Sequence, residues 1–519
     1  MHEMKTETPL SDRIAQCALK HYEVLPNNGG KPQRTEWTVY AAIVAARQQP
    51  ASNDSVTDQE LWVVCSATGS KCTSVRPVVS KLPTRTKQYK GRKRPHSELS
   101  DADTDHKICS CYNGMVLKDS HAETLTRRGL MAVLWNEVES LLQNKSMPRS
   151  LLEPNEPSQD VQQQFKLRDD LSLHMYISDN PCGDATIYRV EKPTSSSSCK
   201  DQPETSINFT GAKIILSGSN GQSVVEKNES ISSTLTCSES KDAPSTSVTL
   251  GREDTQQLGA LRLKSSRSNI PSHLRTLSMS CSDKLVRWGC LGLGGALLSM
   301  YIPKPIVLSS ICVSKDPRAV DIKDDLGQLD ALKRALTDRI ENALASLKEA
   351  GIDWSVAPPV VAVVDYVFEN SKSSSESRQY ERLQKGSDSA TNTKGRVIKE
   401  SPCGMSINWH QTNTLETSNT EVTIGSTGLK RGKKPKCPID VVKSASRLSR
   451  YHFASCCRRC NSVSSETAAD SEATNYWRYK RILSSENVTK AQTVVLGGKG
   501  PLVGWVRGNS EDDFNLPHD

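Results

Sequence analysis

The sequence predicts an α/β fold, and three observations support this prediction. Residues 60–66 and 173–178 are short, largely apolar runs of the kind that form strands. Downstream of Glu123, apolar residues recur at helical spacing for about five turns. Residues 326–350 carry the clearest amphipathic helical pattern, which ends at Gly351. Strands followed by helices of this length indicate a sheet that is covered by helices.

The other elements follow in chain order. Residues 36–47 have few breakers and read as a helix or a buried segment, and residues 115–117 read as a short strand that leads to Asp119. We expect His121 and Glu123 at a helix N-terminus, and a second helix that begins with Pro181 and Cys182. Two such strand-to-helix connections would bring these residues to the same end of a sheet. Further strands are predicted at residues 359–367, 406–409 and 421–425, and a helix at residues 444–460.

Length and composition indicate one folded domain with polar insertions. The chain has 519 residues, but its mean hydropathy of -0.53 is too low for all of them to enter a core. Residues 73–105, 192–257 and 371–399 are polar and lack sustained periodicity, which predicts disordered insertions. We therefore expect an N-terminal segment over residues 1–35 and a single domain over residues 36–519.

Charge and targeting signals restrict the class of protein. A net charge of +8 is compatible with a nucleic-acid partner, although many proteins without one are as basic. The basic run at residues 90–94 is a nuclear localisation signal, an RNA contact or a solvated charge run. The N-terminus lacks the apolar region of a secretory signal, and the longest apolar stretch, residues 288–302, is too short to span a membrane. We expect a protein of the cytoplasm or nucleus, without membrane association and without an evident obligate protein partner.

Three short motifs offer the ligands of a catalytic metal site. His121-Ala-Glu123 supplies a nitrogen ligand and a spare carboxylate, while Pro181-Cys182 and Ser280-Cys281 supply thiolates. Zn2+ with three protein ligands keeps an open position for a water whose pKa falls to roughly 7. His-x-Glu with a distant Pro-Cys is the signature of zinc-dependent deaminases, in which the Glu moves protons and is not a ligand. The usual second Cys after Cys-x-x is absent here, so the third ligand must come from elsewhere.

Each of these residues has an ordinary alternative explanation when it is taken alone. An isolated Cys is usually a small buried hydrophobic residue, and an isolated His is more often a hydrogen-bonded structural residue. The joint occurrence of three motifs in this order favours the metal site. A second zinc site at Cys456, Cys457 and Cys460 is the weaker interpretation of that cluster, because no fourth ligand is evident.

The motifs also carry a specific resemblance. Asp119-Ser-His-Ala-Glu-Thr-Leu-Thr-Arg-Arg128, Asn180-Pro-Cys-Gly-Asp184 and Met279-Ser-Cys-Ser-Asp-Lys284 resemble the three blocks of the adenosine deaminase editase domain family. Matching segments run from about Trp37 to the C-terminus, interrupted by the polar insertions. The resemblance implies that Cys281 is the third zinc ligand and that Glu123 is the general acid and base. It also implies a cytidine-deaminase-like three-layer core, a central mixed sheet with zinc-bearing helices, elaborated by C-terminal helices and strands around a buried polyphosphate.

Cations lie immediately after two of the ligand motifs, where an enzyme buries its core, and buried cations need a countercharge. Members of this family enclose inositol hexakisphosphate beneath the active site. The resemblance implies that this chain binds it through Arg127, Arg128, Lys284, Arg287, Trp288, Arg450, Tyr476, Lys480, Lys490, Trp505 and Asp513. It further implies that Asp119 and Lys284 connect this ligand to the metal centre by hydrogen bonds.

The implied reaction is hydrolytic deamination of adenosine to inosine in RNA, on a base extruded from its stack. No double-stranded RNA-binding module fits in the N-terminal 35 or so residues, because such a module spans about 16 base pairs. This favours the tRNA-specific adenosine deaminase 1 type, whose substrate is the adenosine 3′ of the anticodon (position 37) of alanine tRNA. Ser70 and Lys71, in a turn similar to the family's Gly-Thr-Lys motif, are candidate RNA contacts. The alternatives are editing of double-stranded messenger RNA and a catalytically silent RNA-binding protein.

Overall fold

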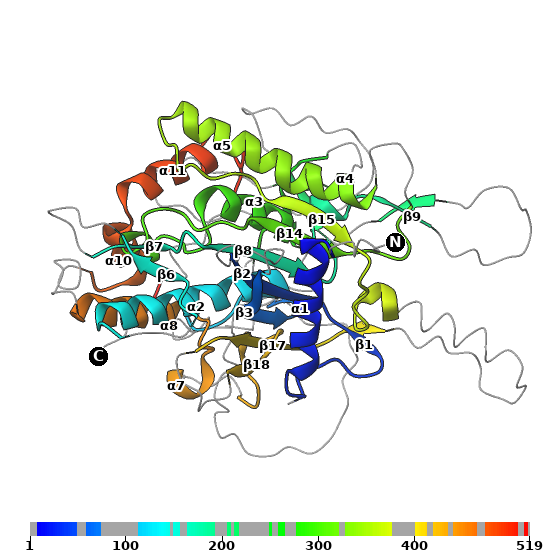
Figure 1. The fold of residues 1–519 in the computed structure, drawn as a ribbon, viewed down its shortest axis with the longest axis horizontal. Helices are drawn as coiled ribbons and strands as arrows, with labels where there is room; N and C mark the ends of the chain where they lie inside the picture. The colour runs from blue at the N-terminus through cyan, green and yellow to red at the C-terminus, as the bar shows by residue number, and fades with distance from the viewer. Residues whose placement is uncertain are drawn as a thin grey trace, which may run out of the picture.

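The computed structural model describes residues 8–27, 29–48, 59–73, 113–145, 149–155, 163–191, 205–208, 212–216, 249–251, 258–264, 277–320, 327–375, 400–412, 419–433, 440–463, 473–506 and 513–516. Its centre is a mixed sheet of eight strands (Figure 1). In spatial order these are β15 (Val360–Val364), β14 (Ser310–Ser314), β8 (Leu171–Ile177), β2 (Tyr40–Arg47), β3 (Glu60–Thr68), β17 (Met405–His410), β18 (Thr420–Ile424) and β19 (Leu429–Lys430). The first three run parallel to one another, and the remaining neighbours are antiparallel.

The central strand β2 shows why the sheet is covered on both faces. Ala41, Ile43 and Ala45 belong to the main core, whereas Tyr40, Ala42 and Val44 belong to a second core on the other face. Successive side chains of a strand point to opposite faces, so a strand that is apolar throughout must be buried on both sides. Residues 36–47, which read from sequence as a helix or a buried segment, are therefore the short strand β1 and the buried strand β2.

Helices form the outer layers. Helix α2 packs on the main-core face against β2, β3 and β17, while α1 packs on the other face against β2, β3 and β8 (Figure 1). Helix α1 belongs to the segment that we set apart from the domain on sequence grounds, and its buried face is part of the second core. The α-helices are α1 (Leu10–Val24), α2 (Ala122–Leu142), α3 (Cys281–Leu291), α4 (Gln328–Leu332), α5 (Arg339–Glu349), α7 (Val441–Ser444), α8 (Arg450–Val463), α10 (Tyr476–Leu483) and α11 (Glu486–Leu496).

Shorter elements complete the described fold. The 3₁₀ turns are η2 (Asp184–Thr186) and η4 (Leu298–Met300), and a π-helical segment η5 (Lys333–Asp338) joins α4 to α5. The small strand pairs are β1 (Glu36–Trp37) with β16 (Ser401–Pro402), β4 (Ser70–Cys72) with β5 (Asp119–His121), and β6 (Leu152–Pro154) with β7 (Phe165–Leu167). Strand β9 (Arg189–Glu191) pairs with β10 (Thr205–Ile207), and β11 (Ala212–Leu216) lies between β12 (Thr249–Gly251) and β13 (Arg262–Lys264).

The structure corrects two predicted elements next to the site. The predicted helix from Pro181 and Cys182 does not form, and only the single turn η2 follows. Gly183 has a φ of +110°, and a Cβ there would lie 2.3 Å from Ser280 Oγ. The chain is held in this turn because it packs directly on the segment that carries Cys281. The predicted strand at residues 115–117 is a turn, and the strand is β5 itself.

The predicted insertions are only partly described. Strands β10, β11 and β12 lie within residues 192–257, so that segment is not devoid of structure. Residues 371–375 form a helical turn with Ser371, Ser373 and Ser375 buried. The basic run at residues 90–94 lies outside the described residues. None of the helices in the described part of the chain combines the length and apolar character needed to span a membrane.

Candidate metal centre and active site

The three predicted metal ligands converge from three different elements. His121 is the N-cap of α2, Cys182 follows β8, and Cys281 is the first residue of α3. The Sγ atoms of Cys182 and Cys281 lie 3.8 and 3.6 Å from His121 Nδ1. With zinc–nitrogen and zinc–sulfur bonds of about 2.0–2.3 Å, tetrahedral ligands of these two types lie roughly 3.6 Å apart. The three side chains therefore fit a tetrahedral metal ion.

Glu123 lies beside these ligands in the first turn of α2. The residue is 2% exposed, and its Oε2 atom has no hydrogen-bond partner among the described residues. It lines a cavity of about 380 Å³ together with His121 and Cys182. A buried carboxylate oxygen without a partner is costly in a folded protein. Its position next to the ligands is suited to a carboxylate that exchanges protons with a molecule bound in the cavity.

A buried hydrogen-bond chain leads away from the metal ligands. Asp119 Oδ2 accepts hydrogen bonds from Lys264 Nζ and Ser278 Oγ, both at 2.8 Å, and from Lys284 Nζ. Lys264 Nζ also lies 3.1 Å from Cys281 Sγ. Burial alone would raise the pKa of Asp119, but Lys264 and Lys284 hold it well below its usual value. The predicted Asp119–Lys284 contact is thus present, and Lys264 extends it to a thiolate.

Sequence reasoning missed Lys264. It lies at the end of β13, just after a segment that we took for a disordered insertion, and it belongs to none of the three motifs. The available signal was the short run Leu261-Arg-Leu-Lys264, in which Leu261 and Leu263 are buried. Apolar alternation of this kind indicates a strand that enters the core.

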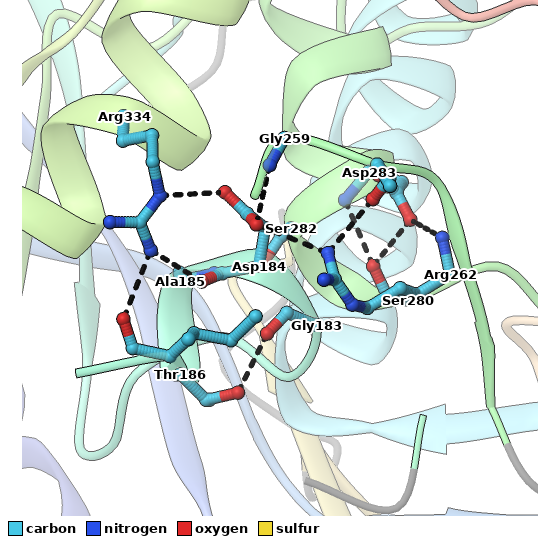
Figure 2. Close-up of polar contacts among 12 residues, drawn as sticks. Gly183, Asp184, Ala185, Thr186, Gly259, Arg262, Ser280, Ser282, Asp283 and Arg334 are labelled. Atoms are coloured by element: carbon cyan, nitrogen blue, oxygen red, sulfur yellow. Dashed lines mark hydrogen bonds and ion pairs between the residues drawn. The ribbon is translucent and has the colours of Figure 1, made fainter. Parts of the chain in front are cut away.

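A second buried network joins the two cysteine-bearing segments directly (Figure 2). Asp184, two residues after Cys182, accepts from Arg262 Nη1 at 3.1 Å and from Arg334 Nε at 3.2 Å. Asp283, two residues after Cys281, accepts from the Arg262 backbone N–H at 2.9 Å and from Arg339 Nη2 at 2.6 Å. Arg262 therefore contacts both aspartates, one with its side chain and one with its backbone.

Further hydrogen bonds connect the same two cysteine-bearing segments. Ser282 Oγ donates to the Pro181 carbonyl at 3.0 Å and accepts from the Ala185 N–H at 3.2 Å. The Cys281 N–H points at Cys182 Sγ over 3.3 Å. Removing one partner of a buried charge pair typically costs about 3–5 kcal/mol, because the remaining charge stays buried. The network thus holds the two thiols at a fixed separation before any metal binds.

The π-helical segment and the helix that follows it each contribute one arginine to this network. Arg334 lies within η5 and Arg339 is the first residue of α5, and Figure 2 shows Arg334 extended from its helix toward Asp184. Arg334 Nη2 also donates to the Asp184 and Ile187 carbonyls at 3.1 and 3.0 Å. Segments of π-helix are rare and frequently occur at functional sites. Here the segment presents Arg334 to Asp184, and α5, which follows it directly, presents Arg339 to Asp283.

The candidate RNA contacts lie at the edge of the active-site cavity. Ser70 lines it, whereas Lys71 is not among its described lining residues and packs its side chain near Gly425. The structure adds Trp37, Tyr188, Arg318 and Lys372 to the wall. The signal for these four was weak, because they lie in different segments and outside every motif.

A second cavity, of about 190 Å³, lies among the helices next to the metal site, and it is strongly basic. Seven residues predicted for polyphosphate binding line it, namely Arg127, Arg128, Arg287, Trp288, Arg450, Tyr476 and Lys480, and no described lining residue is acidic. The other four lie elsewhere. Lys284 bonds to Asp119, and Lys490 is exposed. Trp505 lies under the Arg287 guanidinium at 4.9 Å, and Asp513 accepts from the Trp477 N–H at 3.0 Å.

The cations of this basic cavity repel one another. Burial, followed by the neighbouring cations Arg128 and Arg287, lowers the pKa of Arg127 to about 9. Burial and Arg450 lower the pKa of Arg128 to about 10. Burial, Arg287, Arg450 and Arg127 lower the pKa of Lys480 to about 7. Arg127 Nε has no hydrogen-bond partner among the described residues. The cavity therefore lacks a countercharge of several units among the side chains that line it.

Comparison with known proteins identifies the family. A model of the adenosine-deaminase (editase) domain matches residues 104–507. The tRNA-specific adenosine deaminase 1 of Drosophila melanogaster is 29% identical over 335 residues, which cover 64% of this chain and 60% of that protein. The protein of the same name from Homo sapiens is 26% identical over 495 residues, covering 80% and 84%. The double-stranded RNA-specific editase Adar of Drosophila melanogaster is 28% identical over 240 residues, covering 45% and 27%. The chain belongs to the adenosine-deaminase (editase) domain family and is a deaminase.

Proposed function

We propose that this enzyme hydrolyses adenosine to inosine in tRNA with a zinc ion held by His121, Cys182 and Cys281. Two observations carry the proposal. The three ligands lie together, and Glu123, whose Oε2 atom has no hydrogen-bond partner among the described residues, lines one cavity with His121 and Cys182. When bound, zinc lowers the pKa of a water molecule to roughly 7 and so supplies the nucleophile near neutral pH.

The side chains of this protein supply the proton transfer and the positioning. Glu123 takes the proton from the attacking water and delivers it to the amino group that leaves as ammonia. Asp119 and Lys264 fix the position of Cys281, because Lys264 bonds to both. A base that is stacked on its neighbours cannot reach the metal site, so the target base is extruded from its stack into the cavity before it reacts.

We further propose that the basic cavity holds inositol hexakisphosphate. A molecule with six phosphates can pair with several guanidinium groups at once, in the bidentate geometry that Arg favours. Five cations line this cavity, and its described lining residues include no acidic one; the cations are Arg127, Arg128, Arg287, Arg450 and Lys480. Lys284 and Asp119 would connect this ligand to the metal centre.

The proposed substrate is the adenosine 3′ of the anticodon (position 37) of alanine tRNA. Support comes from the relatives, since the match to the Homo sapiens tRNA-specific adenosine deaminase 1 covers 80% of this chain and the match to Adar covers 45%. Ser70 and Lys71 are proposed to contact the RNA near the cavity mouth.

The test is to incubate purified protein with unmodified alanine tRNA and to map inosine by mass spectrometry of nuclease fragments. We expect inosine at position 37, and none in a matched transcript that carries guanosine there. Long duplex RNA serves as the competing substrate. Inosine in the duplex but not in tRNA would identify a messenger-RNA editing enzyme, and inosine in neither would contradict the proposed activity.

A further inference from the structure

Asp179 is a second carboxylate in the active-site cavity with no assigned role. It lies two residues beyond the end of β8 and lines the same cavity as Glu123. Among the described residues, no hydrogen-bond donor or ion-pair partner contacts its carboxylate. The Asp179 side chain is partly buried, and a carboxylate that lines a cavity without a partner in the protein is available to accept hydrogen bonds from a bound molecule.

The neighbours of Asp179 are fully engaged and fix its surroundings. Asp316 accepts from Arg318 Nε at 3.0 Å and Nη2 at 2.9 Å, and from Tyr188 Oη at 2.8 Å. Asn180 accepts from Gln328 Nε2 at 2.7 Å and donates to the Ala185 carbonyl at 2.6 Å. These bonds occupy the polar groups of Asp316 and Asn180, so both residues are already engaged with other groups of the protein.

The local charges also indicate that Asp179 meets a neutral donor. Burial, followed by Asp316, raises the pKa of Asp179 to about 7, and Glu123 contributes in the same direction. Arg318 and Lys372 favour the ionised form but do not overcome these effects. A phosphate would add a further negative charge to this cluster and would be repelled. The cations Arg318 and Lys372, which line the same cavity, are the better phosphate contacts.

A nucleotide within an RNA chain offers few neutral donors. In an adenosine whose 3′ and 5′ oxygens are esterified, the donors are the 6-amino group and the 2′-hydroxyl. The 6-amino group is the leaving group, which must face Glu123 and the metal ligands. The 2′-hydroxyl is left for Asp179, and it is the group by which proteins distinguish RNA from DNA.

We propose that Asp179 accepts a hydrogen bond from the 2′-hydroxyl of the target nucleotide and thereby makes the site selective for RNA. This inference rests on the proposed deamination of RNA. It assigns Asp179 a role in substrate selection, distinct from the proton transfer by Glu123.

The test combines two substrates with three variants. The substrates are alanine tRNAs made by ligation that differ only in ribose or 2′-deoxyribose at the target adenosine. The proteins are wild type, Asp179→Ala and Asp179→Asn, with Asp365→Ala as the matched control, because the Asp365 side chain is 93% exposed. Single-turnover kcat/KM is measured for each pair, and metal content and circular dichroism verify that each variant is folded and loaded.

We expect the deoxy substitution to lower the wild-type kcat/KM roughly ten- to hundredfold, the range for a hydrogen bond to a charged group. Asp179→Ala should lose a similar factor on the ribose substrate and show no further loss on the deoxy substrate. Asp179→Asn should show an intermediate deoxy penalty, because a neutral acceptor bonds about half as strongly. Asp365→Ala should behave as wild type.

A deoxy penalty that stays unchanged in Asp179→Ala would overturn the inference. If that variant does not fold, an unchanged penalty in Asp179→Asn would overturn it equally. Failure of the proposed function gives a different result, since wild type would then form no inosine from the all-ribose tRNA.

Discussion

Replacing Glu123 with glutamine should lower the rate of inosine formation by about 10²–10⁴-fold, the usual contribution of a general acid–base group. The amide keeps the size of the side chain but cannot take a proton from water or deliver one to the leaving amine. Because Glu123 is not a metal ligand, the variant should retain its metal. Single-turnover deamination of tRNA, with the metal content measured on the same sample, checks both statements.

The matched control is Glu139→Gln on the same helix. Glu139 pairs with Arg459 at 3.0 Å near the surface, so its loss should leave the rate of deamination unchanged. Inosine formation undiminished in Glu123→Gln would contradict the assignment. Loss of the metal together with activity would show that Glu123 acts by supporting the site.

Removing the proposed inositol hexakisphosphate should prevent the protein from reaching its native state. Without a countercharge, the cations of the basic cavity are buried against one another, as the lowered pKa values of Arg127, Arg128 and Lys480 show. A ligand that binds only the native state stabilises it by about 2.7 kcal/mol at roughly 100 times its Kd. Refolding from denaturant, followed by tryptophan fluorescence, should therefore succeed with added inositol hexakisphosphate and fail without it.

Arg127→Met tests the charge argument, because its effect on stability should have opposite signs with and without the ligand. In the presence of the ligand the variant should lose about 1.5–3 kcal/mol of stability, the range for a hydrogen bond to a charged group. In its absence the variant should refold better than wild type, because one mutually repelling cation has been removed. Arg481→Met, at an exposed position next to Lys480, should show neither effect. Equal refolding of wild type with and without the ligand would exclude a structural polyanion here.

The site residues that could be predicted from the sequence are those that lie in short contiguous motifs. His121 and Glu123 are two residues apart, and Cys182 and Cys281 each sit in a distinctive block. Their convergence was expected from two strand-to-helix connections, of which only the one into α2 forms, and β5 belongs to the small pair with β4 and not to the central sheet. The amphipathic pattern at residues 326–350 likewise corresponds to a helix, over α4, η5 and α5.

The residues that could not be predicted act through contacts between distant segments. Lys264 and Arg262 lie on a short strand between two undescribed stretches, and nothing nearby in sequence reveals that they meet Asp119 and Asp184. The turn after Cys182 was mistaken for a helix because its conformation is imposed by packing against Ser280, 97 residues downstream of Gly183. Local propensity carries no information about such a tertiary constraint.

The proposed activity requires one metal ion held by two thiolates and one imidazole, and cobalt substitution tests this most directly. Cobalt-loaded protein should show thiolate-to-metal charge-transfer absorption that weakens, per bound cobalt, in Cys182→Ala and in Cys281→Ala and disappears when both cysteines are replaced. It should persist in Glu123→Gln and in Cys290→Ala, since Cys290 is a buried thiol on the same helix that donates to the Val286 carbonyl. Charge-transfer absorption per bound cobalt that is undiminished in Cys281→Ala, or protein that binds no metal with all three ligands intact, would contradict the proposed metal centre.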